Sequence, residues 1–349
     1  MPATLIRRIK GFRPLYVDKG GALWASKQFR VFKSGDAGET FSLAGIWMPG
    51  AVERLKGVTR LSRRLFRSGF QSLLTLSDGG VIAAVRGAIV RLDPGKRFFK
   101  KTFSIPHGSR PLNLCMTEGG KVFFGEYFDN PSREAVHVYG SEDGGKSWHV
   151  AHTFGRGEIR HVHGVFYDEY RKGCWILTGD RGEECRIAFT DDNFGSVTTV
   201  LSGSQRFRAV TVIPRPRGLI VPTDTPLEQN FIQWIEPERP SVEEISPLPG
   251  SAFYSAKVGK YLLISTVVEP SHTNRCRNAS LFVSKNDGRG WSELYHQRKD
   301  IWPMRYFQYG SLSLPLGGSE NSALYVGGRA LYKIDEHLLV WDLSTAGDS

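Results

Sequence analysis

Two histidines in the segment Arg160-His161-Val162-His163-Gly164 are the residues of this chain that are best suited to chemistry. In a β-strand, His161 and His163 face the same side because successive side chains alternate. One imidazole can then act as a general acid or base or donate a hydrogen bond, while the other has a structural role. Two imidazoles can also hold a metal, but no third ligand follows at a helpful spacing, so we expect no metal site and no cofactor.

Ionisable residues stand beside several apolar segments. The apolar run 122–125 leads into Glu126 and Tyr127, and the run 174–179 leads into Asp180. An ionised group at the end of a buried strand must reach water, a partner charge or a ligand. We expect catalysis from His161, His163, Glu126, Asp180 and Tyr127, and substrate binding from Arg110, Arg208, Arg86, Asp224 and Glu269. The same charges also fit a ring of compensating ion pairs that seals a channel.

An eight-residue turn sequence recurs along the chain and indicates which elements position these side chains. It is clearest at 141–148 and 34–41, looser at 284–291, and most degenerate at 190–196. Its Asp or Asn accepts backbone N–H bonds across the turn, and its glycine supplies a positive φ. We therefore interpret each copy as the tip of a β-hairpin with no catalytic role.

These turns resemble the Asp-box, or BNR repeat, of sialidase-like β-propellers, with the pattern S/T-x-D-x-G-x-T-W/F. The resemblance implies a propeller scaffold over most of the chain. It does not reach the catalytic residues, because the sialidase motif F/Y-R-I-P has only Phe12-Arg13-Pro14 as its counterpart and sialidases have six blades. No sialidase catalytic residue is therefore transferred to this sequence.

The repeat has a period of 45 to 58 residues. The predicted third strands end at Ser34, Leu92, Ser141, Thr190, Ile235, Ser284 and Ile334. Each unit holds four short apolar runs separated by turn residues, the pattern of an antiparallel sheet. We predict an all-β fold: a seven-bladed β-propeller of four-stranded antiparallel blades with Asp-box hairpins, forming a single domain over residues 1–349.

The predicted propeller explains how distant residues form one site. The start of each innermost strand and the end of each second strand lie on the same face of such a ring. Arg110, Arg160 and Arg208 open predicted innermost strands, while Asp180, Asp224 and Glu269 close second strands. Long loops after the second strands of neighbouring units would wall a pocket there. We expect the site at the channel mouth, over blades three to six.

The segment at about 53–69 interrupts the strand pattern. Leu55, Val58, Leu61 and Leu65 have helical spacing, and basic residues fill the positions between them. The pattern predicts one short basic amphipathic helix. It either covers one face of the ring or contacts an anionic membrane surface.

The amino-acid composition and the N-terminal residues indicate which kinds of partner and which cellular compartment to expect. A net charge of +11 favours anionic partners, but no nucleic-acid-binding motif is present, so we expect no nucleic acid partner. Residues 1–12 are basic and are not followed by an apolar run long enough for a signal peptide or a membrane span. We therefore expect a soluble cytoplasmic protein.

Together these features predict a carbohydrate-active β-propeller that acts on an acidic, carboxylate-bearing oligo- or polysaccharide or glycoconjugate. A glycoside hydrolase needs a proton donor and a second carboxylate or a tyrosine. A uronate-directed lyase instead neutralises the carboxylate with Arg or His and moves the C5 proton with His or Tyr. The alternative is a noncatalytic binding or assembly propeller.

Overall fold

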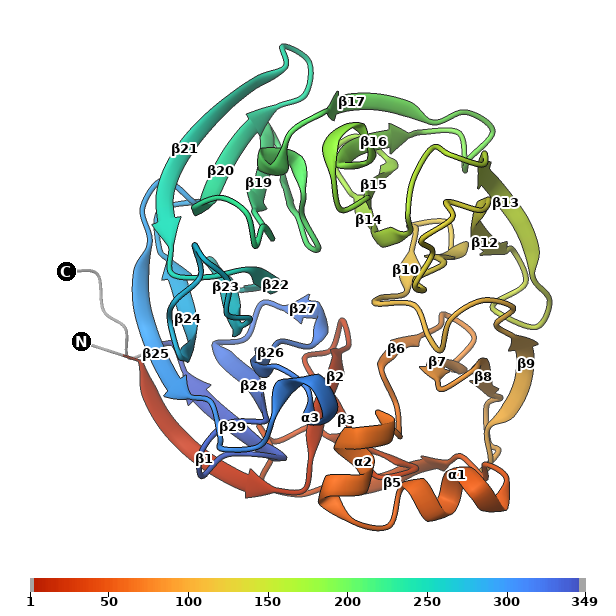
Figure 1. The fold of residues 1–349 in the computed structure, drawn as a ribbon. Coiled ribbons are helices and arrows are strands. Elements are labelled where there is room, and N and C mark those ends of the chain that lie inside the picture. The colour runs from red at the N-terminus through yellow and green to blue at the C-terminus, as the bar shows by residue number, and fades with distance from the viewer. Residues whose placement is uncertain (1–2, 345–349) are drawn as a thin grey trace.

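A ring of antiparallel β-sheets makes up the computed structural model, which describes residues 3–344 (Figure 1). The sheets stand side by side around a centre, and each runs from an innermost strand to a strand at the outer edge (Figure 1). Most residues of the inner strands are buried, because each sheet packs its faces against its two neighbours.

Four sheets have four strands each, paired in chain order. The first comprises β6 (Ser72–Thr75), β7 (Val81–Val85), β8 (Ala88–Leu92) and β9 (Lys100–Ser104). The second comprises β10 (Cys115–Met116), β11 (Val122–Gly125), β12 (Val136–Ser141) and β13 (His149–Phe154). The third comprises β14 (Val162–Asp168), β15 (Gly173–Thr178), β16 (Arg186–Thr190) and β17 (Thr198–Ser202). The fourth comprises β18 (Ile213–Arg215), β19 (Gly218–Pro222), β20 (Asn230–Glu236) and β21 (Ser241–Leu248).

The other thirteen strands pair into one larger sheet. One antiparallel run contains β2 (Arg13–Val17), β3 (Leu23–Lys27), β4 (Arg30–Ser34) and β5 (Ser42–Ile46). Another contains β22 (Ala252–Val258), β23 (Tyr261–Val268), β24 (Asn278–Ser284) and β25 (Ser292–Arg298). The last contains β26 (Gly310–Ser313), β28 (Ala323–Arg329), β29 (His337–Asp342) and β1 (Thr4–Lys10). The short strand β27 (Leu316–Ser319) joins these runs by parallel pairing with β2 and β22.

The N-terminal strand closes the ring, which the sequence did not reveal. Strand β1 pairs with β29 in antiparallel register from Thr4 opposite Asp342 to Lys10 opposite His337. The predicted strand end at Ile334 is wrong: Ile334 lies in the turn between β28 and β29, where it is buried. An apolar buried turn and an apolar strand have the same composition, and the partner of β29 comes from the opposite end of the chain.

Most predicted strand ends are close to the observed ones, with one systematic difference at the inner strands. The third strands of five units end at the predicted residues, and β20 ends at Glu236, one residue later than expected. However, β10 begins only at Cys115, β14 at Val162 and β18 at Ile213. The arginines expected to open these strands therefore lie in the loops that precede them.

The four recurrent turns share one hydrogen-bond pattern and link a third strand to a fourth. In the turn after β12, Ser141 Oγ donates to Asp143 Oδ1 at 2.9 Å, and the backbone N–H of Gly145 donates to Ser141 Oγ at 2.8 Å. Ser147 donates through both its N–H and its hydroxyl to Asp143. The equivalent bonds at the other turns centre on Asp36, Asp192 and Asn286.

The glycine of this turn is required by packing as well as by conformation. Gly145 has φ +78°, and a Cβ added there would lie 2.5 Å from Ile82 Cδ1 of β7. Each such turn therefore presses against the neighbouring sheet and helps to fix the spacing between sheets.

The predicted single helix at 53–69 is wrong: two short helices, α1 (Ala51–Lys56) and α2 (Arg60–Phe66), occupy the segment. Thr59 caps α2 by accepting from the N–H of Ser62, and the Ser62 hydroxyl accepts from the N–H of Thr59. Gly57 ends α1 because any Cβ there would lie 2.5 Å from the ring of Phe29. The spaced apolar residues Leu55 and Val58 are 71% and 62% exposed, so the helices bury no apolar stripe.

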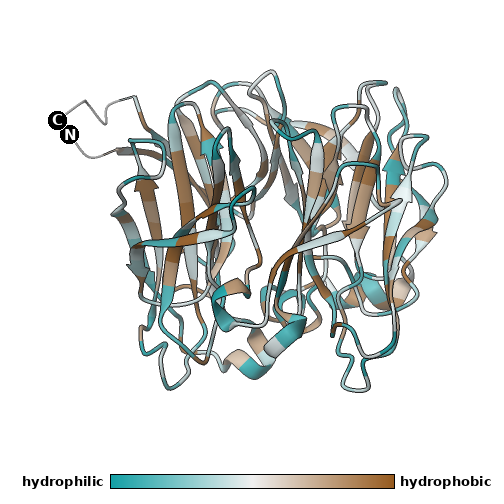
Figure 2. Cartoon of the chain, turned by 90° about the horizontal axis from the view of Figure 1, so that it is seen from above, coloured by the Kyte–Doolittle hydropathy of each residue, from teal (hydrophilic) through white to brown (hydrophobic). Residues whose placement is uncertain are grey.

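Both helices and α3 (Met304–Phe307) lie on one face of the ring, at the bottom of the side view in Figure 2. The strands between the two faces are largely hydrophobic, whereas the connecting loops are mostly hydrophilic (Figure 2). Among residues 3–344, no helix combines the length and the apolar character needed to cross a bilayer.

Candidate active site at the channel mouth

Asp180 is the centre of a polar cluster built from the loops of adjoining sheets. It follows β15, and its carboxylate meets Arg160 Nη1 at 3.0 Å and Arg208 Nη2 at 3.2 Å. The Nε2 atoms of His161 and His163 lie 3.5 and 3.4 Å from Asp180 Oδ1. Burial alone would raise the pKa of Asp180, but the contacts of both histidines and the charge of Arg208 hold it well below its usual range.

The two histidines are fixed through their other ring nitrogen. His161 Nδ1 lies 3.0 Å from the carbonyl of Phe128, and His163 Nδ1 lies 2.9 Å from the carbonyl of Ala209. Their Nε2 atoms lie 3.0 Å apart. Burial lowers the pKa of His163, which is only 2% exposed. The two rings meet, but not through alternation along one regular strand, because His161 precedes β14 and the register of β14 with β15 shifts between Val162 and Gly164.

Tyr127 and two further carboxylates complete this cluster. The Tyr127 ring lies 4.4 Å from that of His161, and burial together with Asp224 and Asp180 raises the pKa of Tyr127 to about 12. Arg208 Nε lies 3.5 Å from Asp224, whose pKa burial raises to about 8. Among residues 3–344, the buried atoms Asp224 Oδ1 and Glu269 Oε2 have no hydrogen-bond partner. We call the set Tyr127, His161, His163, Asp180, Arg208, Asp224 and Glu269 the histidine cluster.

Glu126 was also expected in the site, but its carboxylate is bound elsewhere. Its oxygens contact His107 Nδ1 at 3.0 Å, accept from the N–H of His137 at 2.9 Å and from the Tyr139 hydroxyl at 3.3 Å. Glu126 and Tyr127 are adjacent in sequence, yet only Tyr127 takes part in the histidine cluster. The structure thus assigns Glu126 to contacts that join its own sheet to the loop carrying His107.

Arg86 and Arg110 also lie apart from the histidine cluster. The guanidinium of Arg86 is exposed and donates to the carbonyl of Phe66 at the end of α2. That of Arg110 donates to the carbonyl of Arg67. The substrate-binding residues predicted from the sequence are therefore split between two parts of the rim.

Arg110 belongs to a second set of residues, the arginine group, which comprises Arg13, Arg67, Arg110 and Arg329. Arg13 donates to the carbonyl of Phe70 at 2.9 Å, and Arg329 donates to Gln308 Oε1 at 2.9 Å. Within residues 3–344, the hydrogen bonds of Arg13, Arg110 and Arg329 go to carbonyl and amide oxygens, and no carboxylate lies within ion-pair distance of any of the four.

Burial is the main cause of the lowered pKa values of Arg13 and Arg110, and repulsion from neighbouring arginines adds to it. Burial and the charge of Arg329 lower the pKa of Arg13 to about 9. Burial and the charges of Arg329, Arg13 and Arg67 lower the pKa of Arg110 well below its usual range. An anion placed among these guanidinium groups would relieve the repulsion.

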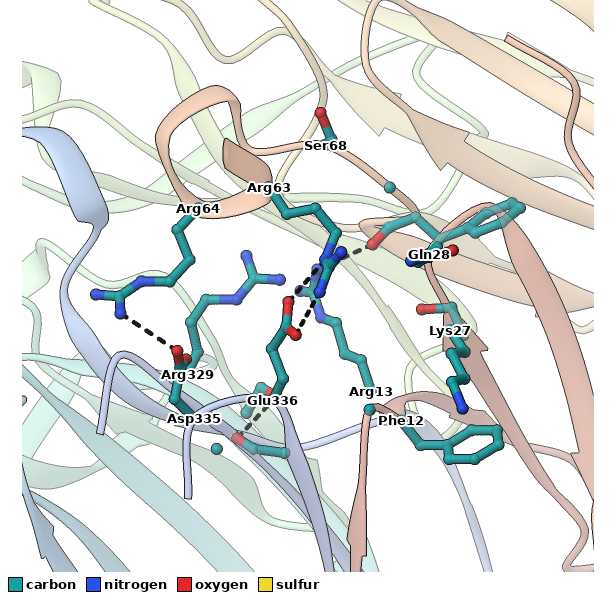
Figure 3. A pocket seen from close by; sticks show the side chains of 17 residues that line it. Phe12, Arg13, Lys27, Gln28, Arg63, Arg64, Ser68, Arg329, Asp335 and Glu336 are labelled. Atoms are coloured by element: carbon teal, nitrogen blue, oxygen red, sulfur yellow. Dashed lines mark hydrogen bonds and ion pairs between the residues drawn. The ribbon is translucent and has the colours of Figure 1, made fainter. Parts of the chain in front are cut away.

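Arg13 and Arg329 line a cavity of about 100 Å³ (Figure 3). The acidic residues beside it are already paired with α2: Arg63 with Glu336 at 2.6 Å and Arg64 with Asp335 at 3.3 Å. Figure 3 shows Arg13 and Arg329 extending into the space between these pairs. A second cavity of about 240 Å³ runs along the innermost strands and is also lined by Arg13, together with Tyr254.

Arg13, Arg67 and Arg329 were missed as site residues, although two of them carried a usable signal. Arg13 is the first residue of the innermost strand β2, the kind of position that was expected for Arg110. Arg329 is the last residue of the second strand β28, and Glu269 directly follows the second strand β23. The same positional rule that selected the other candidates therefore also selects these two arginines.

Comparison with known proteins identifies the architecture. No protein-family model matches the sequence, and no curated protein matches it. A chain of the mitotic checkpoint complex superposes with a TM-score of 0.57 at 11% identity, over 97% of this chain and 94% of its own length. The extracellular domain of a one-component system from B. thetaiotaomicron gives 0.58 at 10% identity, over 98% of this chain and 40% of the other.

A GH74 xyloglucanase from Xanthomonas campestris gives a TM-score of 0.54 at 14% identity, over 83% of this chain and 46% of the enzyme. Identities of this size show the fold alone. The all-β architecture is a β-propeller, as predicted.

Proposed function

We propose that this propeller is a carbohydrate-active enzyme that acts on a carboxylate-bearing oligo- or polysaccharide at the channel mouth. One observation carries the proposal: the arginine group gathers guanidinium groups that have no carboxylate partner within residues 3–344. Guanidinium groups bind carboxylates through paired, charge-assisted hydrogen bonds. The nearby carboxylates of Asp335 and Glu336 are paired with Arg64 and Arg63, so a polyanionic saccharide would supply the carboxylate partners that the arginine group lacks.

The histidine cluster contains the side chains that would carry out proton transfer in the proposed site. The hydroxyl of Tyr127 lies among the charges of Asp180, Asp224, Arg208 and Glu269. Elimination from a uronate transfers the C5 proton to a base, forms a C4–C5 double bond and breaks the C4–O bond, and the leaving oxygen takes up a proton. Cationic side chains favour this reaction because negative charge builds up on the carboxylate in the transition state. Because its raised pKa keeps the Tyr127 hydroxyl protonated, we assign to Tyr127 the donation of a proton to the leaving oxygen.

Hydrolysis has weaker support from the geometry. It requires a proton donor at the scissile bond and a second carboxylate or a tyrosine. Glu126 is engaged by His107, His137 and Tyr139, and Arg208 holds both Asp180 and Asp224. We therefore favour elimination. The xyloglucanase with the same fold indicates that a propeller is compatible with saccharide chemistry.

The test is an activity screen on oligosaccharides of galacturonate, glucuronate and mannuronate, with neutral xylo-oligosaccharides as the control. Ultraviolet absorbance of the unsaturated product reports elimination, and new reducing ends report both reactions. We expect both signals with an acidic substrate and neither with the neutral one. Reducing ends without absorbance would replace elimination by hydrolysis. Absence of turnover and of binding for every acidic saccharide would refute the proposal.

A noncatalytic binding or assembly propeller is the second candidate, and the ion pairs around Asp180 favour it. A continuous series of ion pairs runs from Arg160 through Asp180 and Arg208 to Asp224. Such a series would suit a purely structural closure of the channel. This candidate predicts that an acidic saccharide binds without new reducing ends. Isothermal titration with the same saccharides separates it from the enzyme.

We also propose that α1 and the α1–α2 connection contact an anionic membrane surface. Val52, Leu55 and Val58 are 66%, 71% and 62% exposed, and Arg54 and Lys56 lie beside them. Exposed apolar side chains next to basic residues are typical of interfacial segments. The helices lie on one face of the ring, near the arginine group, so a saccharide carried by a lipid would approach from that side.

The strand pairing supports two finer structural proposals. We infer seven blades, because the pairings separate seven four-stranded antiparallel runs, the last one closed by β1. We further infer that the four turns are Asp-box repeats, since the same Ser or Thr and Asp or Asn bonds recur in each.

A further inference from the structure

Three possible ligand atoms converge in the histidine cluster: the Nε2 atoms of His161 and His163 and a carboxylate oxygen of Asp180. A carbonyl oxygen only accepts hydrogen bonds, so the Nδ1 atoms of His161 and His163 carry the hydrogens that point to Phe128 and Ala209. In the neutral rings, each Nε2 then has a free lone pair. These two nitrogens lie 3.0 Å apart and face the carboxylate oxygen of Asp180.

The spacing of these atoms matches a metal coordination shell. The ligand atoms of His161, His163 and Asp180 all lie within 4.8 Å of one another, with separations of 3.0, 3.4 and 3.5 Å. Ligands about 2.0–2.2 Å from a tetrahedral ion are separated from each other by about 3.3–3.6 Å, so the two contacts of Asp180 fit directly and the Nε2 atoms need to move apart by about 0.3 Å. One ion can therefore contact all three atoms without rearrangement of the strands.

We propose that His161, His163 and Asp180 bind one divalent transition-metal ion. Two imidazoles and one carboxylate form a donor set of the type that holds such ions while leaving a coordination position open. This proposal does not depend on the saccharide, because it rests on the three side chains alone. It also gives the histidines a role, coordination, that differs from the proton transfer expected from the sequence.

The surroundings orient the three ligands as metal sites require. Both Nδ1 atoms are held by backbone carbonyls, which fix the ring tautomers and the direction of Nε2. Arg160 and Arg208 hold the Asp180 carboxylate in place. Among residues 3–344, Glu269 Oε2 has no hydrogen-bond partner, and its carboxyl group lies close by. The site is therefore preorganised around a cation.

The experiment uses the full-length protein with any affinity tag removed, because polyhistidine tags bind the same metals. Metal content is measured by mass spectrometry after dialysis, and the chelator-treated protein is then titrated with Co²⁺ while its visible absorption is recorded. Wild-type protein should bind one Co²⁺ per chain, and Zn²⁺ should displace it. His163→Gln and Asp180→Asn should each weaken Co²⁺ binding by about tenfold or more.

His149→Gln is the matched control, because His149 lies exposed on β13, outside the cluster, and should leave Co²⁺ binding unchanged. A saturable Co²⁺ spectrum that is lost in both site variants supports the site. Absence of bound metal and of any Co²⁺ spectrum in the wild-type protein overturns it, whatever the variants do. Unchanged binding in Asp180→Asn also overturns it. Neither readout involves a saccharide, so failure of the proposed function leaves this result independent.

Discussion

Arg64 of α2 and Asp300, which follows β25, form an ion pair at 2.5 Å across the ring closure, with the Arg64 side chain only 2% exposed. The same guanidinium meets Asp335 at 3.3 Å and donates to the carbonyl of Phe307. Arg64, one of the basic residues between the spaced apolar positions of this segment, is thus the buried link between α2 and the last sheets.

Arg64→Met should destabilise the protein by about 3 kcal/mol, because it removes a buried charge that Asp300 and Asp335 share and leaves them only Lys299 and Arg60 as partners. Chemical denaturation monitored by fluorescence measures the loss. Arg54→Met on the exposed side of α1 is the control and should change the free energy of unfolding by less than about 0.5 kcal/mol. Equal stability of both variants would show that the buried pair contributes nothing.

Asp143→Asn should lower the free energy of unfolding by about 1–3 kcal/mol. Asp143 accepts hydrogen bonds from Ser141, Lys146 and Ser147 within the turn. Burial alone would raise the pKa of Asp143, but the Ser147 and Ser141 bonds lower it to about 2. Its stabilising effect is therefore present above about pH 4, the unfolded pKa, and declines as the pH falls toward 2.

The measurement for Asp143 is a series of unfolding curves at pH 7, 4 and 2. The difference between wild type and Asp143→Asn should shrink at the lowest pH. Glu142→Gln, which removes an exposed partner of Lys121, should show only a small difference at every pH. A constant difference for Asp143→Asn across the series would contradict the assignment of the effect to the ionised carboxylate.

Arg329→Gln should weaken binding of an acidic oligosaccharide by about tenfold or more, because it removes a charge-assisted contact in the arginine group. Isothermal titration at fixed ionic strength measures the affinity. Arg97→Gln removes the same charge at an exposed position away from this group and should leave the affinity within about twofold. Equal losses of affinity in the two variants would show that the net charge of the protein, rather than a specific site, determines binding.

Tyr127→Phe should abolish turnover of an acidic oligosaccharide while retaining most of its binding, since only the hydroxyl is removed. Single-turnover kinetics and titration on the same preparation separate the two effects. Tyr167→Phe, at an outward-facing position of β14, is the matched control. Retention of full activity in Tyr127→Phe would remove this residue from the mechanism.

The double variant Val52→Ser/Leu55→Ser should reduce binding to anionic phospholipid vesicles by about tenfold or more, because two apolar side chains are lost from the contact. Vesicle sedimentation measures this binding, with phosphatidylserine as the anionic lipid and phosphatidylcholine as the uncharged control. Val150→Ser removes an exposed apolar side chain from the outer strand β13 and should have no effect. Absence of wild-type binding to anionic vesicles would exclude the membrane contact.

Local signals predicted most of the scaffold. The turns at Asp36 and Asp143 fix their own geometry through bonds that span only a few residues, so their sequence determines their structure. The closure of the ring depends on the pairing of β1 with β29, and no local sequence pattern predicts a pairing between strands so far apart in the chain. Ile334 was misplaced for this reason.

The candidate site was only partly predictable, because strand ends do not reveal which way a side chain points. Asp180 and His163 meet as expected, whereas Glu126 turns toward Tyr139 although it also follows a second strand. Arg13 and Arg329 come from sheets at opposite ends of the sequence, so their proximity appears only after the ring closes.

The pairing of β1 with β29 also sets an order of events during synthesis. Strand β1 remains without its partner until β29 has left the ribosome. Until then the final sheet has an open edge, which invites pairing with other chains. The ring should therefore close only after β29 has left the ribosome, and chaperones that shield nascent strands should raise the yield of folded protein.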